Sequence, residues 1–196
     1  VAKMHGYRRQ SRREPGWPPW IPPSPGIRSW ESAMCFPATV CFEALGAVDH
    51  GRATNLAFQV IGSEWIRGKE VVERLGDSDL PGVMFHRHYY APDPASRASQ
   101  IFDGVRMTVT DPNRFRPILT AVSLVHCLQH LYGRSRIWAT DRSRPEFFDK
   151  LFGTRTVREA LMDREDGRTI AARWEKDLAA FRESRKKRLL YSRSPH

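Results

Sequence analysis

The stretch GVRMTVTDPNRFRPILTAVSLVHCLQHLY, residues 104–132, decides the fold class. In residues 104–110 apolar and polar side chains alternate, which predicts a half-buried strand. Residues 111–113, Asp-Pro-Asn, are typical of a turn that also caps a helix. From about 114 to 132 apolar residues recur every three or four positions, so a helix with one face in the core is expected. A strand leading into a long helix indicates a mixed α/β domain.

The sequence before this stretch continues the same mixture. Short apolar runs at 38–43 and 57–61 are bounded by glycine and predict buried strands, with a polar loop at 44–56 between them. Residues 67–75 have the pattern of a helix, and 83–90 follow Pro-Gly as a further strand.

The sequence after residue 132 predicts helices only. One is expected at 145–152, and Thr156 to Glu159 fits a capping box that opens another. The last helix is expected from about Thr169, with its apolar stripe formed by Ile170, Trp174, Leu178 and Phe181. The basic run that follows suits the carboxyl end of a helix dipole.

Residues 8–28 are rich in proline and include Trp17 and Trp20, which excludes a helix and favours extended or polyproline II backbone. We therefore expect two parts: an extended Pro/Trp-rich arm over 1–36 and a mixed α/β domain over 37–196, with a small mixed sheet flanked by helices. A 40% hydrophobic content is enough to fill the core of such a domain.

The net charge of +10 is concentrated at the two ends of the chain. Nucleic acid is one partner that this charge could attract, because Lys and Arg bind phosphate without sequence preference. We disfavour that interpretation, since no zinc finger, RNA-recognition or helix-turn-helix signature accompanies the charge. An acidic partner domain or an anionic substrate explains the charge equally well.

Membrane and metal binding find little support in the sequence. The longest apolar run, within 117–128, is interrupted by Ser123 and His126, so no membrane span is expected. The three cysteines show no CxxC spacing and are interpreted as buried apolar residues. His126 and His130 lie four apart on the predicted helix, but no third ligand is indicated, and we predict no metal site.

One acidic residue, Glu43, stands where a predicted apolar strand ends and the polar loop begins. Loops after strands often carry function, and a carboxylate there could act as general acid or base. Arg52, in the same loop, could bind a substrate carboxylate through its two-pronged guanidinium. A simpler alternative stays open at this point: Glu43 and Arg52 pair with each other and only brace the loop.

Several blocks of the sequence resemble the bacterial exo-β-N-acetylmuramidases, glycoside hydrolases once catalogued as a domain of unknown function. The matching blocks occur in the family's order along nearly the whole chain: Val1 to Arg9, Trp20 to Pro25, Phe36 to Glu43, Gly51 to Ile66, Leu80 to Phe85, Gly104 to Asp111, Phe115 to Pro117, Phe152 to Thr154, Leu178 to Arg182 and Leu189 to Tyr191. The chain departs from the family pattern at Gly26, at Ala44-Leu45-Gly46, at Asp49 and at Ala53, where the family has glycine and a positive φ angle is expected.

The resemblance implies the carboxy-terminal part of a two-domain enzyme whose amino-terminal Rossmann-like domain is absent from this chain. It implies peptidoglycan fragments bearing N-acetylmuramic acid as partners, and no cofactor, because carboxylates perform glycoside hydrolysis. The expected catalytic residue is Glu43, and the expected substrate-binding residues are Gly51, Arg52, Thr54 and Asn55. The resemblance is to bacterial proteins; export to the periplasm or the cell exterior is one expectation, with its signal upstream of Val1.

Three functions are carried forward from the sequence. The first is a glycoside hydrolase domain that helps form the muramic acid site and is inactive alone. The second is a non-catalytic, diverged module that binds peptidoglycan or a partner protein. The third is nonspecific nucleic-acid binding by the basic ends.

Overall fold

The structure is a computed structural model that describes residues 1–9, 11, 18–92 and 100–191. The chain divides into two compact units. One consists of Trp20–Ala171 and holds the sheet and most of the helices. The other joins Val1–Pro19 to Ala172–His196. The predicted arm over 1–36 and domain over 37–196 remain a proposal; part of the arm's sequence, including Trp17, lies outside the described residues.

A three-stranded antiparallel sheet in the order β1-β3-β2 forms the centre of the larger unit. Strand β3 (Phe102–Val109) pairs along its whole length with β2 (Val83–Tyr90), and β1 (Val60–Ile61) adds two residues on its other side. The predicted strands at 83–90 and 104–110 are therefore confirmed, and the predicted strand at 57–61 is shorter than expected.

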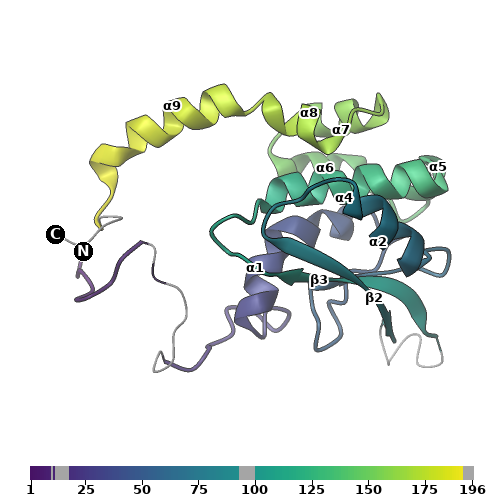
Figure 1. The fold of residues 1–196 in the computed structure, drawn as a ribbon, viewed down its shortest axis with the longest axis horizontal. Coiled ribbons are helices and arrows are strands. Elements are labelled where there is room, and N and C mark those ends of the chain that lie inside the picture. Colours follow the sequence, from purple (N-terminus) through teal and green to yellow (C-terminus); the bar gives the residue numbers. More distant parts are fainter. Residues whose placement is uncertain (10, 12–17, 93–99, 192–196) are drawn as a thin grey trace. The chain divides into compact units, whose positions relative to one another are not determined.

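The helices α2 (Gly68–Gly76) and α4 (Pro117–Tyr132) pack beside the sheet and against each other, as Figure 1 shows. Most of α4 is buried, which agrees with its predicted apolar face. It begins at Pro117 and not at 114, because the Asp111 side chain and carbonyl oxygen accept hydrogen bonds from Asn113 and Arg114 and hold these residues in a turn. Proline suits the first turn of a helix, where its missing N–H is not needed.

The predicted strand at 38–43 is wrong. Helix α1 (Trp30–Thr39) occupies its beginning, and the 3-10 helix η1 (Val40–Ala44) follows directly. The Ser29 side chain caps α1 by accepting a hydrogen bond from the Ser32 N–H. A segment that is buried on several sides has a continuous run of apolar residues. Such a run has no period that would distinguish a buried strand from a buried helix.

Short helices follow α4: α5 (Ser135–Trp138), α6 (Pro145–Phe152), α7 (Thr156–Met162) and α8 (Gly167–Ala172). The bidentate pair of Arg158 with Asp149 joins α7 to α6, with N–O distances of 2.9 and 2.7 Å. The predicted capping role of Thr156 is wrong, because Thr156 lies inside α7 and its N–H donates to the Thr154 hydroxyl.

The smaller unit contains the helix α9 (Glu175–Arg185) and the 3-10 helix η2 (Lys186–Arg188). The sequence predicted one helix from about residue 169, whereas α8 and α9 are separated by a turn at 173–174. Tyr191 links the two ends of the chain inside this unit: its hydroxyl accepts from the Met4 N–H at 2.8 Å, and its ring meets that of Tyr7 edge to face.

Candidate functional site

A surface pocket of about 530 Å³ lies where η1 meets the loop that follows it. Its lining comes from η1, from the loop, and from two residues at the ends of the long strands: Phe42, Glu43, Gly46, Ala47, Val48, Asp49, His50, Arg52, Ala53, Pro92 and Phe102. Of the predicted site residues, Glu43 and Arg52 line this pocket, whereas Gly51, Thr54 and Asn55 do not.

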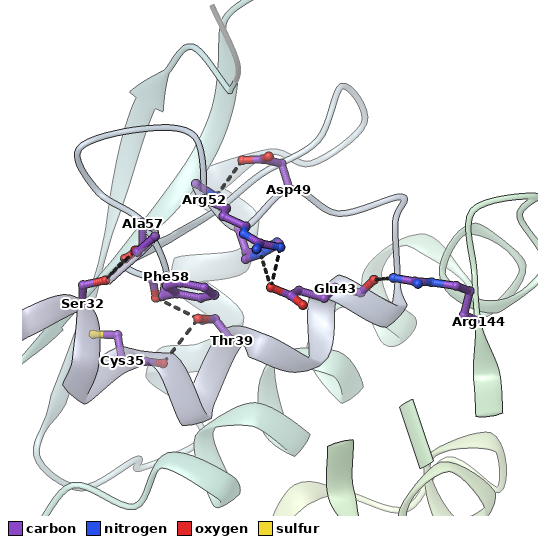
Figure 2. Close-up of polar contacts among 12 residues, drawn as sticks. Ser32, Cys35, Thr39, Glu43, Asp49, Arg52, Ala57, Phe58 and Arg144 are labelled. Atoms are coloured by element: carbon purple, nitrogen blue, oxygen red, sulfur yellow. Dashed lines mark hydrogen bonds and ion pairs between the residues drawn. The ribbon is translucent and has the colours of Figure 1, made fainter. Parts of the chain in front are cut away.

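Glu43 reaches this pocket from near the end of η1, while its neighbours Phe42 and Ala44 are buried. Its Oε1 atom accepts a hydrogen bond from Nη1 of Arg52 at 3.1 Å (Figure 2). Its backbone carbonyl accepts from the Arg144 guanidinium at 2.6 Å, which joins η1 to the start of α6. The Glu43 side chain is 21% exposed and that of Arg52 is 64% exposed, so the pair sits at the pocket's surface with the guanidinium outermost.

The loop turns at Gly51, whose φ of +70° suits glycine and few other residues. The Gly51 N–H donates to Oδ1 of Asp49, and its carbonyl accepts from both the N–H and the hydroxyl of Thr54. The Thr54 hydroxyl also accepts from the Leu56 N–H at 2.9 Å. Gly51 and Thr54 therefore shape the loop that carries Arg52. Asn55 is exposed and does not line the pocket.

Two hydroxyl groups on α1 hold the far side of the loop, an arrangement that the sequence did not suggest. Ser32 donates to the carbonyl of Ala57 and Thr39 to the carbonyl of Phe58, each at 2.8 Å (Figure 2). Phe58 has a positive φ of 65°, which is unusual for a large residue. Both hydroxyl groups belong to buried residues, so this clamp fixes the backbone where the loop ends, at Ala57 and Phe58.

Asp49 and His50 also line the pocket. Asp49 exchanges backbone hydrogen bonds with Gly62, and its Oδ1 accepts from the Tyr90 hydroxyl at 2.8 Å. Burial, together with the Asp49 carboxylate, raises the pKa of Tyr90 far above its usual value, so this hydroxyl stays protonated. Asp49 is thus a bracing carboxylate, with its Oδ1 oxygen already engaged by two donors.

His50 is 9% exposed, and its ring packs against Phe58 with centroids 5.3 Å apart. Its Nε2 atom is buried, lies 3.7 Å from Oε1 of Glu43, and has no hydrogen-bond partner among the described residues. Burial lowers the pKa of His50 and outweighs the opposite effect of the Asp49 and Glu43 carboxylates. The sequence placed His50 in the loop but gave it no role.

The positions that depart from the family pattern fall in different environments. Ala44 and Leu45 are fully buried and do not line the pocket. Ala53 does line it, but Ala53 is not among the residues with positive φ, so the expected backbone strain there is wrong. A Cβ atom added at Gly26 would lie 3.7 Å from the Arg52 side chain and 3.6 Å from Phe58, so this position borders the candidate site.

The other candidate ligands give no cluster. Among residues 1–9, 11, 18–92 and 100–191, no group of three His, Cys, Asp or Glu side chains could hold a metal ion. The rings of His126 and His130 stack with centroids 6.4 Å apart. Cys35, Cys41 and Cys127 are buried free thiols, and burial raises the pKa of each to about 12. None of the described helices is both long and apolar enough to cross a membrane.

Comparison with known proteins gives a consistent result. Residues 34–191 match the family model described as the C-terminal part of the exo-β-N-acetylmuramidase NamZ. The chain is 30% identical over 191 residues to the peptidoglycan β-N-acetylmuramidase NamZ of Bacillus subtilis strain 168, covering 97% of this chain and 45% of that protein. The crystal structure of a DUF1343 family protein from Bacteroides fragilis superposes with a TM-score of 0.80 at 26% identity, covering 88% of this chain and 45% of that one.

These matches confirm the predicted mixed α/β fold and the predicted family resemblance. The chain spans less than half the length of both relatives, so more than half of each relative has no counterpart in it.

Proposed function

Because the chain belongs to the C-terminal family of the exo-β-N-acetylmuramidase NamZ, we propose that its Glu43–Arg52 pocket forms one wall of a site for N-acetylmuramic acid. The substrate would be a peptidoglycan fragment that ends in this sugar. The observation that carries the proposal is the ion pair itself: a largely exposed guanidinium, held by a carboxylate at 3.1 Å, at the edge of a pocket of about 530 Å³.

Arg52 would recognise the feature that distinguishes N-acetylmuramic acid from N-acetylglucosamine, its lactyl carboxylate. The guanidinium has five N–H donors, and Glu43 engages the Nη1 end, so further donors remain for a second carboxylate. A guanidinium forms its strongest hydrogen bonds with carboxylates, often two in parallel. Glu43 holds Arg52 in place and is also the carboxylate of the pocket best placed to take part in acid–base chemistry.

Hydrolysis of a glycosidic bond by carboxylates requires two of them on opposite sides of the bond. The other carboxylate of this pocket, Asp49, already accepts hydrogen bonds from the Gly51 N–H and the Tyr90 hydroxyl. We therefore assign the second catalytic carboxylate to a partner domain, the Rossmann-like amino-terminal domain that the family resemblance implies. The isolated chain is then expected to bind the sugar weakly and not to hydrolyse its glycosides.

Binding to the isolated chain tests the sugar site. Titration calorimetry should detect N-acetylmuramic acid and not N-acetylglucosamine. Arg52→Ala should weaken binding about tenfold or more, since hydrogen bonds to charged groups contribute about 1.5–3 kcal/mol. Arg155→Ala is the matched control, because Arg155 is also largely exposed, pairs with a glutamate, and precedes α7, outside the pocket lining. Equal affinity for both sugars, or no effect of Arg52→Ala, would reject the proposal.

A chimera tests catalysis and distinguishes between two hypotheses: that the chain is a domain of an active enzyme, and that it is a non-catalytic binding module. In the B. subtilis relative, the matched region is replaced by residues 1–196, and release of N-acetylmuramic acid from a chromogenic glycoside is measured. Turnover that is lost in Glu43→Gln supports a catalytic role for this domain. A chimera that binds the sugar and does not hydrolyse the glycoside supports the diverged binding module instead.

A further inference from the structure

The smaller unit, Val1–Pro19 with Ala172–His196, carries almost all of the chain's net charge. Its sequence holds 13 Lys and Arg against 4 Asp and Glu, a net charge of +9, whereas the whole chain has +10. The larger unit is therefore nearly neutral. A charge so unevenly distributed creates a positive field on one unit, which attracts an acidic surface and repels a second copy of the same unit.

The same unit exposes apolar side chains along one stretch. None of the residues of α9 is buried. Leu178 and Phe181 on α9 are 39% and 58% exposed, and Leu189 and Leu190 after η2 are 37% and 51% exposed. We call these four residues the α9 face. Exposed apolar clusters with a polar or charged rim are typical of protein interaction sites.

Charged side chains accompany the apolar residues of the α9 face, and one of them lies next to Phe181. The Arg185 guanidinium lies 5.9 Å from the centre of the Phe181 ring, and Arg182 pairs with Glu175 at 3.6 Å. The basic side chains of η2 connect Phe181 to Leu189 along the sequence. An apolar centre with a basic rim resembles half of a protein interface, in which the apolar part supplies affinity and the rim supplies orientation and speed of association.

We propose that the α9 face is the docking surface for an acidic patch on the domain that makes up the rest of the full-length relatives. This inference rests on the proposed function, which requires such a partner domain. The family match extends to residue 191, so α9 and the following turn belong to the region shared with relatives more than twice as long. A polyanion alone does not fit, because it would leave the four apolar side chains exposed to water.

The test compares one substitution in two backgrounds, without any sugar present. Phe181→Ser is introduced into residues 1–196 and into the chimera with the B. subtilis relative, and the denaturant midpoint is measured in both. The docking surface predicts an unchanged midpoint in the isolated chain and a lowered midpoint in the chimera. Met84→Ser, at a similarly exposed apolar residue of β2, should leave both midpoints unchanged. A fall in the isolated chain as large as that of Phe148→Ser, in the core, would show that the chain itself buries Phe181 and would overturn the proposal.

Association in trans tests the basic rim. The part of the B. subtilis relative outside the matched region is added to residues 1–196 at increasing NaCl. We expect affinity to fall with salt, and Arg182→Glu with Lys186→Glu to weaken binding about tenfold or more. Binding to phosphatidylglycerol vesicles or polyphosphate that is stronger than binding to this domain would overturn the proposal in favour of an anionic surface. Loss of muramic acid binding with docking intact would count against the proposed function alone.

Discussion

Gly51 determines the direction in which Arg52 leaves the backbone of the site loop. Its φ is +70°, and a Cβ atom there would lie 2.4 Å from Cγ2 of Val60 and 3.0 Å from the Leu56 carbonyl oxygen. Both the backbone conformation and the available space exclude a larger residue. The glycine is therefore a structural requirement of the pocket, even though it has no side chain to offer a ligand.

Gly51→Ala should lower the free energy of unfolding by about 2–4 kcal/mol, because it combines a left-handed conformation with a steric clash. Chemical denaturation monitored by tryptophan fluorescence measures the change. Gly76→Ala is the matched control: it lies in α2, a Cβ there meets nothing within 4 Å, and a small stabilisation is expected. Equal effects at the two positions would contradict the role assigned to Gly51.

His50 should make the stability of the chain depend on pH. Its pKa is lowered from the usual 6.5 in the folded state, chiefly by burial, so the unfolded chain binds the proton more readily. Stability is then fully present above pH 6.5 and is lost as the pH falls below that value. Asp49, Glu43 and Arg52 are the charged groups that act on the ring, and their effects are smaller than that of burial.

His50→Gln should reduce the loss of stability between pH 6.5 and pH 5 without abolishing it, since His88 and His126 also have pKa values lowered by burial. Unfolding free energies measured at several pH values compare this variant with His86→Gln, the same chemical change at an exposed position. An undiminished pH dependence in His50→Gln would mean that His50 takes up its proton without opposition from the fold.

At the scale of elements, the site depends on α1 more than on any strand. Ser32 and Thr39 are separated by about two turns on α1, and their hydroxyl groups bind two successive carbonyls, those of Ala57 and Phe58. The loop that carries Arg52 lies between this clamp and the 3-10 helix that carries Glu43. Rigid support of this kind is what a binding site needs to keep its geometry.

Ser32→Ala and Thr39→Val should each destabilise the chain by about 1–3 kcal/mol, because each leaves a buried carbonyl without a donor. Amide hydrogen exchange should also accelerate in residues 49–62, and muramic acid affinity should fall with Arg52 unchanged. Thr108→Val removes a hydroxyl from an exposed position of β3 and serves as the control. Faster exchange spread over the whole chain in the clamp variants would indicate a general loss of stability in place of a local one.

How well the sequence predicted each element depended on the signal that the element left. Strands β2 and β3 and helix α2 were predicted because alternation or glycine punctuation marks them locally. Helix α1 was missed, because it begins beside a Pro-rich segment, contains Pro37, and continues into an apolar run that resembled a strand. Nothing in the local pattern around Ser32 or Thr39 indicates that their partners lie 25 and 19 residues away.

The candidate site was predicted only in part, because local patterns reveal neighbouring residues but not partners that are distant in the sequence. The pairing of Glu43 with Arg52 was an open alternative, and the structure contains that ion pair at the edge of a pocket. The two interpretations are compatible, since a braced arginine is better placed to bind a carboxylate. The bracing role of Asp49 depends on Tyr90, 41 residues away on β2, which no spacing rule connects to the loop.

At the scale of the whole molecule, the three buried cysteines lie in three different elements of the larger unit. Cys35 lies on α1, Cys41 on η1 and Cys127 on α4, and each is at most 3% exposed. Helix α1 contacts both α4 and η1, and η1 also contacts α6, so exposing a thiol requires one of these elements to separate from its neighbours. The three thiols therefore report on the integrity of the same unit that holds the pocket.

Native protein should react with a thiol-specific aromatic disulfide only as fast as this core opens. Burial raises the pKa of each thiol to about 12, so the reactive thiolate is scarce in the folded state at pH 8, and the reagent is also excluded sterically. All three cysteines should react within minutes in denaturant, and in native buffer their slow reactions should share one rate. Gly51→Ala and Thr39→Val should raise the logarithm of that rate in proportion to their loss of free energy of unfolding, because the open state becomes more populated. One thiol that reacts rapidly while the other two stay protected would show that its helix opens independently, and the core would then not behave as a single cooperative unit.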